Sequence, residues 1–304
     1  MDRQKVLAIV GPTGIGKTSL SVWLAKQLDG EIISCDSMQV YKKMDIGTAK
    51  VTQEEMQGIH HELIDVQNYN EPYNVKVFQE KSRTAIEDVV KRGKFPILCG
   101  GTGLYLKAAL YDYEFQEENE DIAYTTFLNS KTNEELVAML KEKDEKALEK
   151  IHPNNRKRLI RALQICHSGT SKSEQEDKQQ HIPLYDVYFL GLDVNRDILH
   201  DRINKRVDIM FENGLVKEVK DLFTNPETWE YTSFQGIGYK EFKDYFLKEK
   251  SIDEVKTAIK THSRQYAKRQ YTWFKNQMPV HWFEAQNRDE IYSAVKEWLM
   301  DEDK

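Results

Sequence analysis

Long apolar runs and paired cysteines are both absent from this sequence of 304 residues. No apolar stretch approaches the roughly 20 residues that a membrane-spanning helix needs, so we expect no membrane partner. The three cysteines, Cys35, Cys99 and Cys166, are scattered and lack metal-ligand spacing, so we expect reduced thiols in a cytoplasmic protein. Because the first apolar segment begins at residue 6, we also expect no signal peptide.

An excess of positive charge is missing as well, since the formal net charge is −6. Taken alone, this value argues weakly against a nucleic-acid partner. The basic residues are nevertheless clustered in two runs without acidic residues, at 156–161 and 256–275. In the second run, basic residues recur every fourth position and share one helical face: Lys256, Lys260, Arg264 and Lys268. Cationic residues beside aromatic ones are typical of binding to looped RNA, so we predict an RNA or nucleotide partner.

The most informative motif is a glycine-rich loop with the sequence Gly11-Pro12-Thr13-Gly14-Ile15-Gly16-Lys17-Thr18. It follows an apolar run at 6–10, a predicted buried strand, and precedes helical spacing at 19–26, which is the context of a phosphate-binding P-loop. Backbone N–H groups of such a loop converge on one anion, and Lys17 can reach the outer phosphate oxygens. The Thr18 hydroxyl can bind Mg²⁺. The motif predicts a pyrophosphate site without identifying its ligand.

A strand that ends in an acidic residue, which P-loop ATPase motors use for Mg²⁺, is not evident. The predicted strand at 95–99 is followed by Gly100-Gly101-Thr102-Gly103. This second glycine turn indicates either another anion site or close helix packing. Asp36 follows a predicted strand at 31–34, so it should lie on the same edge of the sheet as the P-loop. From position alone, Asp36 is a metal ligand, a general base or a loop cap.

The distribution of apolar residues predicts an α/β fold. Predicted strands cover 6–10, 31–34, 60–65, 95–99, 186–192 and 280–283, and predicted helices cover 19–26, 73–92, 104–110, 196–223, 251–275 and 288–300. Between them, amphipathic helices at 133–151 and 156–165 are accompanied by an acidic segment at 114–121 and a polar loop at 168–180. We predict a P-loop NTPase-like parallel sheet flanked by helices, formed by 1–112 and 182–304, with an inserted all-helical domain at 113–181.

Seven motifs along the chain resemble those of the tRNA isopentenyltransferase (IPP transferase) family, whose bacterial members are tRNA dimethylallyltransferases. They are GPTGIGKT (11–18), DSMQVYKKMDIGTAK (36–50), HHELIDV (60–66), GGTGLYLKAAL (100–110), IHPNNRKRLIRAL (151–163), GIGYKE (236–241) and RQYAKRQYTWFK (264–275). The resemblance implies transfer of a dimethylallyl group from dimethylallyl diphosphate to N6 of the adenosine just 3′ of a tRNA anticodon. It implies that the P-loop binds the isoprenoid diphosphate with Mg²⁺ near Thr18.

The resemblance also implies roles for single residues. Asp36 matches the general base, and Thr13 would lie near the bridging oxygen of the diphosphate. Arg206 is the arginine expected to stabilise the negative charge of the departing diphosphate, with Arg202 as the alternative. The implied tRNA contacts are Ser37, Met38, Gln39, Thr102, Lys157, Arg158, Leu159, Ile160, Arg161, Gly236, Ile237, Gly238, Tyr239, Lys240, Lys268, Arg269, Gln270, Tyr271, Thr272, Trp273, Phe274 and Lys275. The helical insertion would clamp the anticodon stem-loop, and the adenine would flip out of its stack to react. We expect a monomer.

Three other hypotheses stay open at this point. A prenyltransferase acting on free adenine nucleotides would share the P-loop and the acid, but would need no extended cationic surface. A small-molecule kinase would transfer phosphate from ATP without an allylic donor. A nucleic-acid-binding module with a vestigial P-loop would bind tRNA regardless of Asp36 and Lys17.

Overall fold

The computed structural model describes residues 3–115, 121–174 and 181–301. The chain divides into two compact units, which we call the core unit (Met1–Tyr111 with Pro183–Lys304) and the helical unit (Asp112–Ile182). Parts of the predicted acidic segment (116–120) and of the predicted polar loop (175–180) lie outside the described residues. Among the described helices, none combines the length and apolar character that crossing a bilayer requires.

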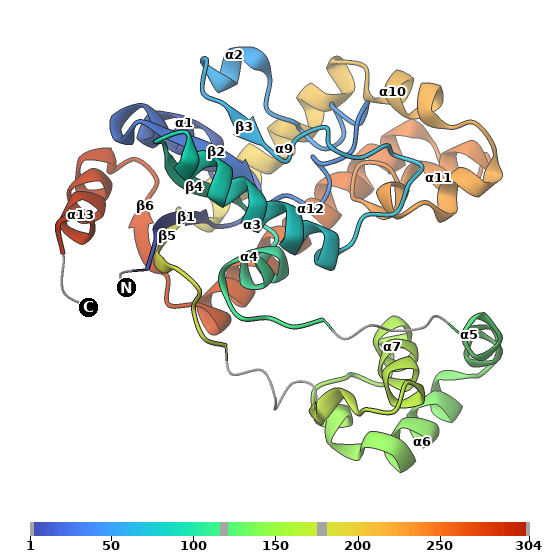
Figure 1. The fold of residues 1–304 in the computed structure, drawn as a ribbon. Helices are drawn as coiled ribbons and strands as arrows, with labels where there is room; N and C mark the ends of the chain where they lie inside the picture. The colour runs from blue at the N-terminus through green and yellow to red at the C-terminus, as the bar shows by residue number, and fades with distance from the viewer. Residues whose placement is uncertain (1–2, 116–120, 175–180, 302–304) are drawn as a thin grey trace. The chain divides into compact units, whose positions relative to one another are not determined.

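The core unit is built on a parallel sheet, which confirms the predicted fold class (Figure 1). Its strands are β1 (Lys5–Val10), β2 (Gly30–Ser34), β3 (His61–Glu62), β4 (Phe95–Gly100), β5 (Asp186–Asp193) and β6 (His281–Glu284), in the order β3-β2-β4-β1-β5-β6. All neighbouring strands run parallel, with Val10 beside both Gly100 and Gly191. The carboxyl ends of β1, β2 and β4 therefore place the P-loop, Asp36 and the second glycine turn at one edge.

Helices cover both faces of the sheet because the side chains of each strand alternate between them. Leu7 and Ile9 of β1 pack with α1 (Lys17–Leu28) and α13 (Arg288–Met300). The alternate residues Val6, Ala8 and Val10 belong to the cluster that includes α3 (Val75–Lys91) and α4 (Gly103–Leu110). Figure 1 shows α13 beside β6.

Two predicted elements are shorter in the structure than in the sequence analysis. The prediction of a single helix at 196–223 is wrong. In the structure α9 (Arg196–Glu212) ends before Gly214, and Gly214, with a φ of 94°, is the N-cap of a second helix, α10 (Leu215–Leu222). Glycine accepts this left-handed conformation without strain, which makes it a natural helix break. The predicted strand at 60–65 is reduced to β3, because Leu63 and Asp65 adopt φ values of 63° and 56°.

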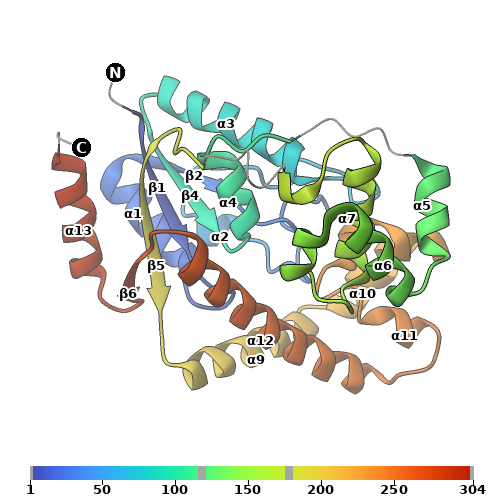
Figure 2. The same ribbon diagram turned by 90° about the horizontal axis from the view of Figure 1, so that it is seen from below.

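Several short elements of the core unit were not predicted. They are α2 (Gln53–Met56), α11 (Phe242–Phe246) and the 3₁₀ turns η2 (Pro226–Glu230) and η3 (Thr232–Gln235). The predicted helix at 251–275 is confirmed as α12 (Ile252–Gln277), which begins with a capping box between Ser251 and Glu254. It lies beside α9 (Figure 2).

The helical unit contains α5 (Ile122–Asn129), α6 (Asn133–Asp144), η1 (Glu145–Glu149) and α7 (Arg156–His167) around a small apolar core. The predicted helix at 133–151 ends at Asp144, whose side chain caps η1 and accepts from the backbone and hydroxyl of Ser173. The beginning of the predicted polar loop is therefore anchored. Arg156 donates to carbonyl oxygens of α5, which leaves Lys157, Arg158 and Arg161 as the exposed part of this basic run.

Candidate active site

The P-loop joins β1 to α1 through three glycines with positive φ. Gly11, Gly14 and Gly16 have φ values of 141°, 79° and 108°. A Cβ on Gly14 would lie 3.0 Å from Cγ1 of Ile203 in α9, so a side chain there would be both strained and crowded. Lys17 folds back over the loop and donates to the carbonyl oxygens of Gly11 and Pro12 at 3.0 and 2.8 Å.

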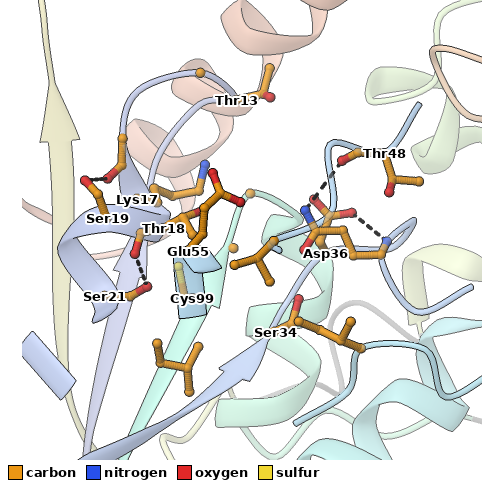
Figure 3. Close-up of a pocket in the computed structure, with 18 of the residues that line it drawn as sticks. Thr13, Lys17, Thr18, Ser19, Ser21, Ser34, Asp36, Thr48, Glu55 and Cys99 are labelled. Carbon is orange, nitrogen blue, oxygen red and sulfur yellow. Dashed lines mark hydrogen bonds between the residues drawn. The ribbon is translucent and has the colours of Figure 1, made fainter. Parts of the chain in front are cut away.

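Two cavities meet beside this loop. The P-loop cavity, of about 380 Å³, is lined by Thr13, Lys17 and Thr18 of the loop and by Asp36 (Figure 3). The second cavity, of about 430 Å³, is lined by Met38, Tyr105 and Ile237 among others. Five residues line both cavities: Thr13, Asp36, Thr48, Arg206 and Tyr266. A ligand in each cavity could therefore react with the other at the shared boundary.

Asp36 fills one of the roles that its sequence position left open, that of a loop cap, and also faces the cavities. Its Oδ1 accepts from the backbone N–H groups of Met38 and Gln39 at 2.8 and 3.3 Å, which caps the loop after β2. The same side chain lines both cavities. Because one carboxylate oxygen makes the capping bonds, the group can shape the loop and still face a substrate.

Arg206 of α9 joins the P-loop to the loop at 45–50. Its Nη1 donates to Thr13 Oγ1 at 3.3 Å and its Nη2 donates to Ala49 O at 3.0 Å. Burial lowers the pKa of Arg206, while Asp36 acts in the opposite direction. Arg202 is more exposed, lines only the first of the cavities described, and donates to Ile15 O at 3.4 Å. The geometry favours Arg206 as the cation between the two cavities.

Lys17 has an unusually low pKa for a lysine. Burial lowers it to about 8, although Cys99 and Asp36 nearby act to raise it. Its charge is thus partly lost just above neutral pH. An anion bound to Lys17 would favour the protonated form and raise this pKa again.

The affinity of the protein for Mg²⁺–pyrophosphate should therefore fall above pH 8. Once Lys17 is mainly neutral, the affinity should fall by a factor that approaches ten for each further pH unit, because only the cationic form of Lys17 attracts the anion strongly. Calorimetric titrations at pH 7, 8 and 9 would measure this change. The Lys17→Met variant corrects for the titration of pyrophosphate itself, and an equal fall in both proteins would contradict the assignment.

The second glycine turn is explained by packing. A Cβ on Gly100 would lie 2.3 Å from Cys35 O, and one on Gly103 would lie 2.1 Å from Cε3 of Trp273. Thr102 Oγ1 accepts from the backbone N–H of Ser37 at 3.3 Å, so the turn supports the loop that carries Asp36. These contacts favour the packing alternative over a second anion site.

Glu218 of α10 holds the loop at 45–47, a role that no sequence motif indicated. Its carboxylate accepts from the backbone N–H groups of Asp45, Ile46 and Gly47 at 2.7–3.0 Å, and from the Tyr239 hydroxyl at 2.7 Å. A Cβ on Gly47 would lie 2.6 Å from the Tyr239 ring. The carboxylate therefore locks together two loops whose neighbours, Thr48 and Ile237 among them, line the second cavity.

Replacing Glu218 with Ala should lower the free energy of unfolding by about 2–3 kcal/mol, because four donors lose a charged acceptor. Urea unfolding would measure the loss. The exposed Glu212 at the end of α9 provides a matched control, and Glu212→Ala should change stability by less than about 0.5 kcal/mol. Similar losses in both variants would show that the loop does not depend on Glu218.

The basic face predicted on α12 does not form a free cationic surface along its whole length. Lys256 and Lys260 both pair with Asp208 Oδ1 of α9, at 2.6 and 2.7 Å, and Arg264 donates to Asn204. The spacing of basic residues could not reveal this acid on a neighbouring helix, which reduces the positive charge of this part of the face. Contact between this part of α12 and RNA stays a prediction. Lys268, farther along α12, is exposed.

The predicted tRNA-contacting residues fall into three groups in the structure. Those that line a cavity are Ser37, Met38, Gln39, Gly236, Ile237, Lys240, Arg269 and Gln270. Those with exposed side chains are Lys157, Arg158, Arg161, Lys268, Thr272 and Lys275. The third group is held by contacts within the fold. Leu159, Tyr239 and Phe274 are buried in the cores, and Ile160 packs against the core of the helical unit. Gly238 packs against Gly47, Trp273 packs against Gly103, Tyr271 donates to Asp193, and Thr102 accepts from Ser37. Direct RNA contact by the buried Leu159, Tyr239 and Phe274 side chains is incompatible with their burial.

Other residues that line the cavities were missed by the sequence analysis. Tyr266 of α12 lines both, and burial together with Asp36 raises its pKa to about 12. Glu55 and His61 line the P-loop cavity, and Tyr41 and Tyr73 line the second. Tyr41, His61 and Tyr266 lie within the motifs that carry the family resemblance, but local periodicity alone could not show which cavity each side chain faces.

Oxygen donors in the P-loop cavity suit a hard cation such as Mg²⁺. The Thr18 hydroxyl and the carboxylates of Asp36 and Glu55 all line this cavity. Elsewhere, Glu31, His60 and Glu62 offer ligand atoms within 4.8 Å of one another. The carboxylates of Glu31 and Glu62 both pair with Arg92, at 2.6 and 2.8 Å, so we assign no metal to this cluster.

Comparison with known proteins decides the family. The model of the family described as IPP transferase matches residues 39–277. The chain belongs to the IPP transferase family. It is 48% identical over 301 residues to a tRNA dimethylallyltransferase of Bacillus anthracis, covering 97% of this chain and 96% of that protein.

Solved structures of IPP transferase relatives resemble this chain over nearly its full length. The full-length tRNA isopentenylpyrophosphate transferase of Bacillus halodurans is 42% identical with a TM-score of 0.75, covering 98% of this chain and 97% of that one. The enzyme of Staphylococcus epidermidis is 40% identical with a TM-score of 0.71, at 97% and 99% coverage. A eukaryotic dimethylallyltransferase acting on tRNA is 31% identical with a TM-score of 0.81, at 98% and 78% coverage.

Proposed function

We propose that this chain transfers the dimethylallyl group of dimethylallyl diphosphate to N6 of the adenosine just 3′ of a tRNA anticodon. The observation that carries the proposal is the boundary shared by the two cavities, which Asp36, Thr13 and Arg206 all line. Family membership and the names of the relatives support the same reaction.

The P-loop cavity would bind the diphosphate. Loop N–H groups, Lys17 and Arg206 would stabilise the negative charge that develops as the allylic C1–O bond breaks. Thr13 would face the bridging oxygen from the same boundary. When bound, Mg²⁺ would neutralise part of the diphosphate charge, with Thr18 as its protein ligand.

The second cavity would receive the flipped adenine. Its N6 amine is a weak nucleophile because its lone pair is delocalised into the ring. As the N6–C1 bond forms, Asp36 would accept the N6 proton, and diphosphate would leave with the electrons of the C1–O bond. Met38 and Ile237 offer apolar surface for the base.

Transfer can be tested by incubating the protein with labelled dimethylallyl diphosphate and Mg²⁺ in the presence of unmodified tRNA, AMP or ATP. Label should appear in tRNA. Label in AMP but not in tRNA would favour the free-nucleotide prenyltransferase, and no label in any acceptor would contradict both prenyltransferase hypotheses.

Exposed basic residues of α7 should make tRNA binding depend on salt. Removing two phosphate contacts in Lys157→Gln/Arg158→Gln should lower the slope of log affinity against log salt by roughly 1.4, as expected for single-stranded RNA. Filter binding between low and moderate salt would measure the slope. Lys141→Gln/Lys143→Gln on α6 removes the same charge from other exposed positions. An equal effect of the two double variants would contradict a specific role for α7.

A further inference from the structure

Gln270 of α12 connects the P-loop to the second glycine turn. The side chain is only 6% exposed. Its Oε1 accepts from the backbone N–H of Thr13 at 2.9 Å, and its Nε2 donates to Gly101 O at 2.9 Å. A Cβ on Gly101 would lie 2.1 Å from Nε2, so the glycine provides the space that the amide occupies.

This contact uses an N–H group that a P-loop would otherwise be free to direct at an anion. Thr13 is instead held at two points, by Gln270 at its backbone and by Arg206 Nη1 at its hydroxyl, 3.3 Å away. Both clamps come from helices outside the loop. They define where the hydroxyl lies at the boundary between the cavities.

We propose that Gln270 is a positioning residue that acts through Thr13. By fixing the Thr13 backbone, it keeps the hydroxyl at the place where charge develops on the departing diphosphate. Lys17 and the N–H groups from Gly14 onward are not tied by this amide, so ground-state binding of the diphosphate depends on it less. This inference rests on the proposed prenyl transfer.

Gln270→Leu should lower kcat for tRNA prenylation by about a hundredfold, the size expected when one preorganised contact to a developing charge is lost. The KM values for both substrates should change by less than about threefold. Gln277→Leu makes the same chemical change at an exposed position of α12 and should leave kcat unaltered. A large rise in KM with unchanged kcat would overturn the assignment.

A double-mutant cycle with Thr13→Ala separates positioning from a general structural effect. If Gln270 acts through Thr13, Gln270→Leu should cost less than about threefold in kcat once the Thr13 hydroxyl is gone. A full hundredfold loss in both backgrounds would overturn the proposal.

Hydrogen exchange of the Thr13 amide provides a readout that needs no prenyl transfer. The amide should be protected in the wild type and in Gln277→Leu, and should lose protection in Gln270→Leu. Retained protection in Gln270→Leu would overturn the positioning role even if the enzyme were inactive. Loss of protection, with no transfer by the wild type, would contradict the proposed function alone.

Discussion

Asp36→Asn is expected to lower kcat for tRNA prenylation by about 10³-fold, with tRNA affinity changed by less than about threefold. The amide retains a carbonyl oxygen that can accept from the N–H groups of Met38 and Gln39, so the loop after β2 keeps its cap. What is lost is the basicity that removes the N6 proton. Single-turnover kinetics and tRNA binding measured on the same preparation would separate these effects.

Asp36→Ala is the informative comparison, because it removes the base and the loop cap together. We expect it to be as slow as Asp36→Asn and, in addition, to bind tRNA more weakly, since Met38 would no longer be held. If Asp36→Asn lost tRNA binding and turnover in equal measure, the carboxylate would be structural and the two-cavity mechanism would fail.

The parts of the site that could be predicted from the sequence are those made by neighbouring residues. The P-loop needs only a strand, glycines that accept positive φ, and a following helix, all within residues 5–28. The place of Asp36 follows from the rule that parallel strands end at one edge of their sheet. Gly214 is also a local signal for a helix break, but the apolar pattern continues on both sides of it and therefore predicted one continuous helix.

The parts that could not be predicted depend on contacts between distant segments. The sequence presents Lys256 and Lys260 as part of a basic stripe, but in the structure both pair with Asp208 of α9, which offsets part of their charge. Glu218 is one of two acids on the amphipathic helix α10, and its three backbone donors lie more than 170 residues earlier. Local spacing carries no information about such partners, which appear only once the sheet has brought the helices together.

Arg206→Gln should lower kcat/KM for dimethylallyl diphosphate by about 10²–10³-fold, because a preorganised cation at the boundary of the cavities is removed. Its guanidinium joins Thr13 to Ala49, so the variant loses both the charge and the link between the two loops. Steady-state kinetics with saturating tRNA would measure the loss.

Arg202→Gln is the matched comparison, four residues earlier on the same helix. Its side chain is exposed and its one bond to the P-loop, at 3.4 Å, is long, so we expect less than a tenfold effect. Arg206→Lys should recover only part of the activity, because a single ammonium group cannot reproduce the planar, two-point contact of the guanidinium. Equal losses in Arg202→Gln and Arg206→Gln would mean that general positive charge, rather than a placed guanidinium, stabilises the departing diphosphate.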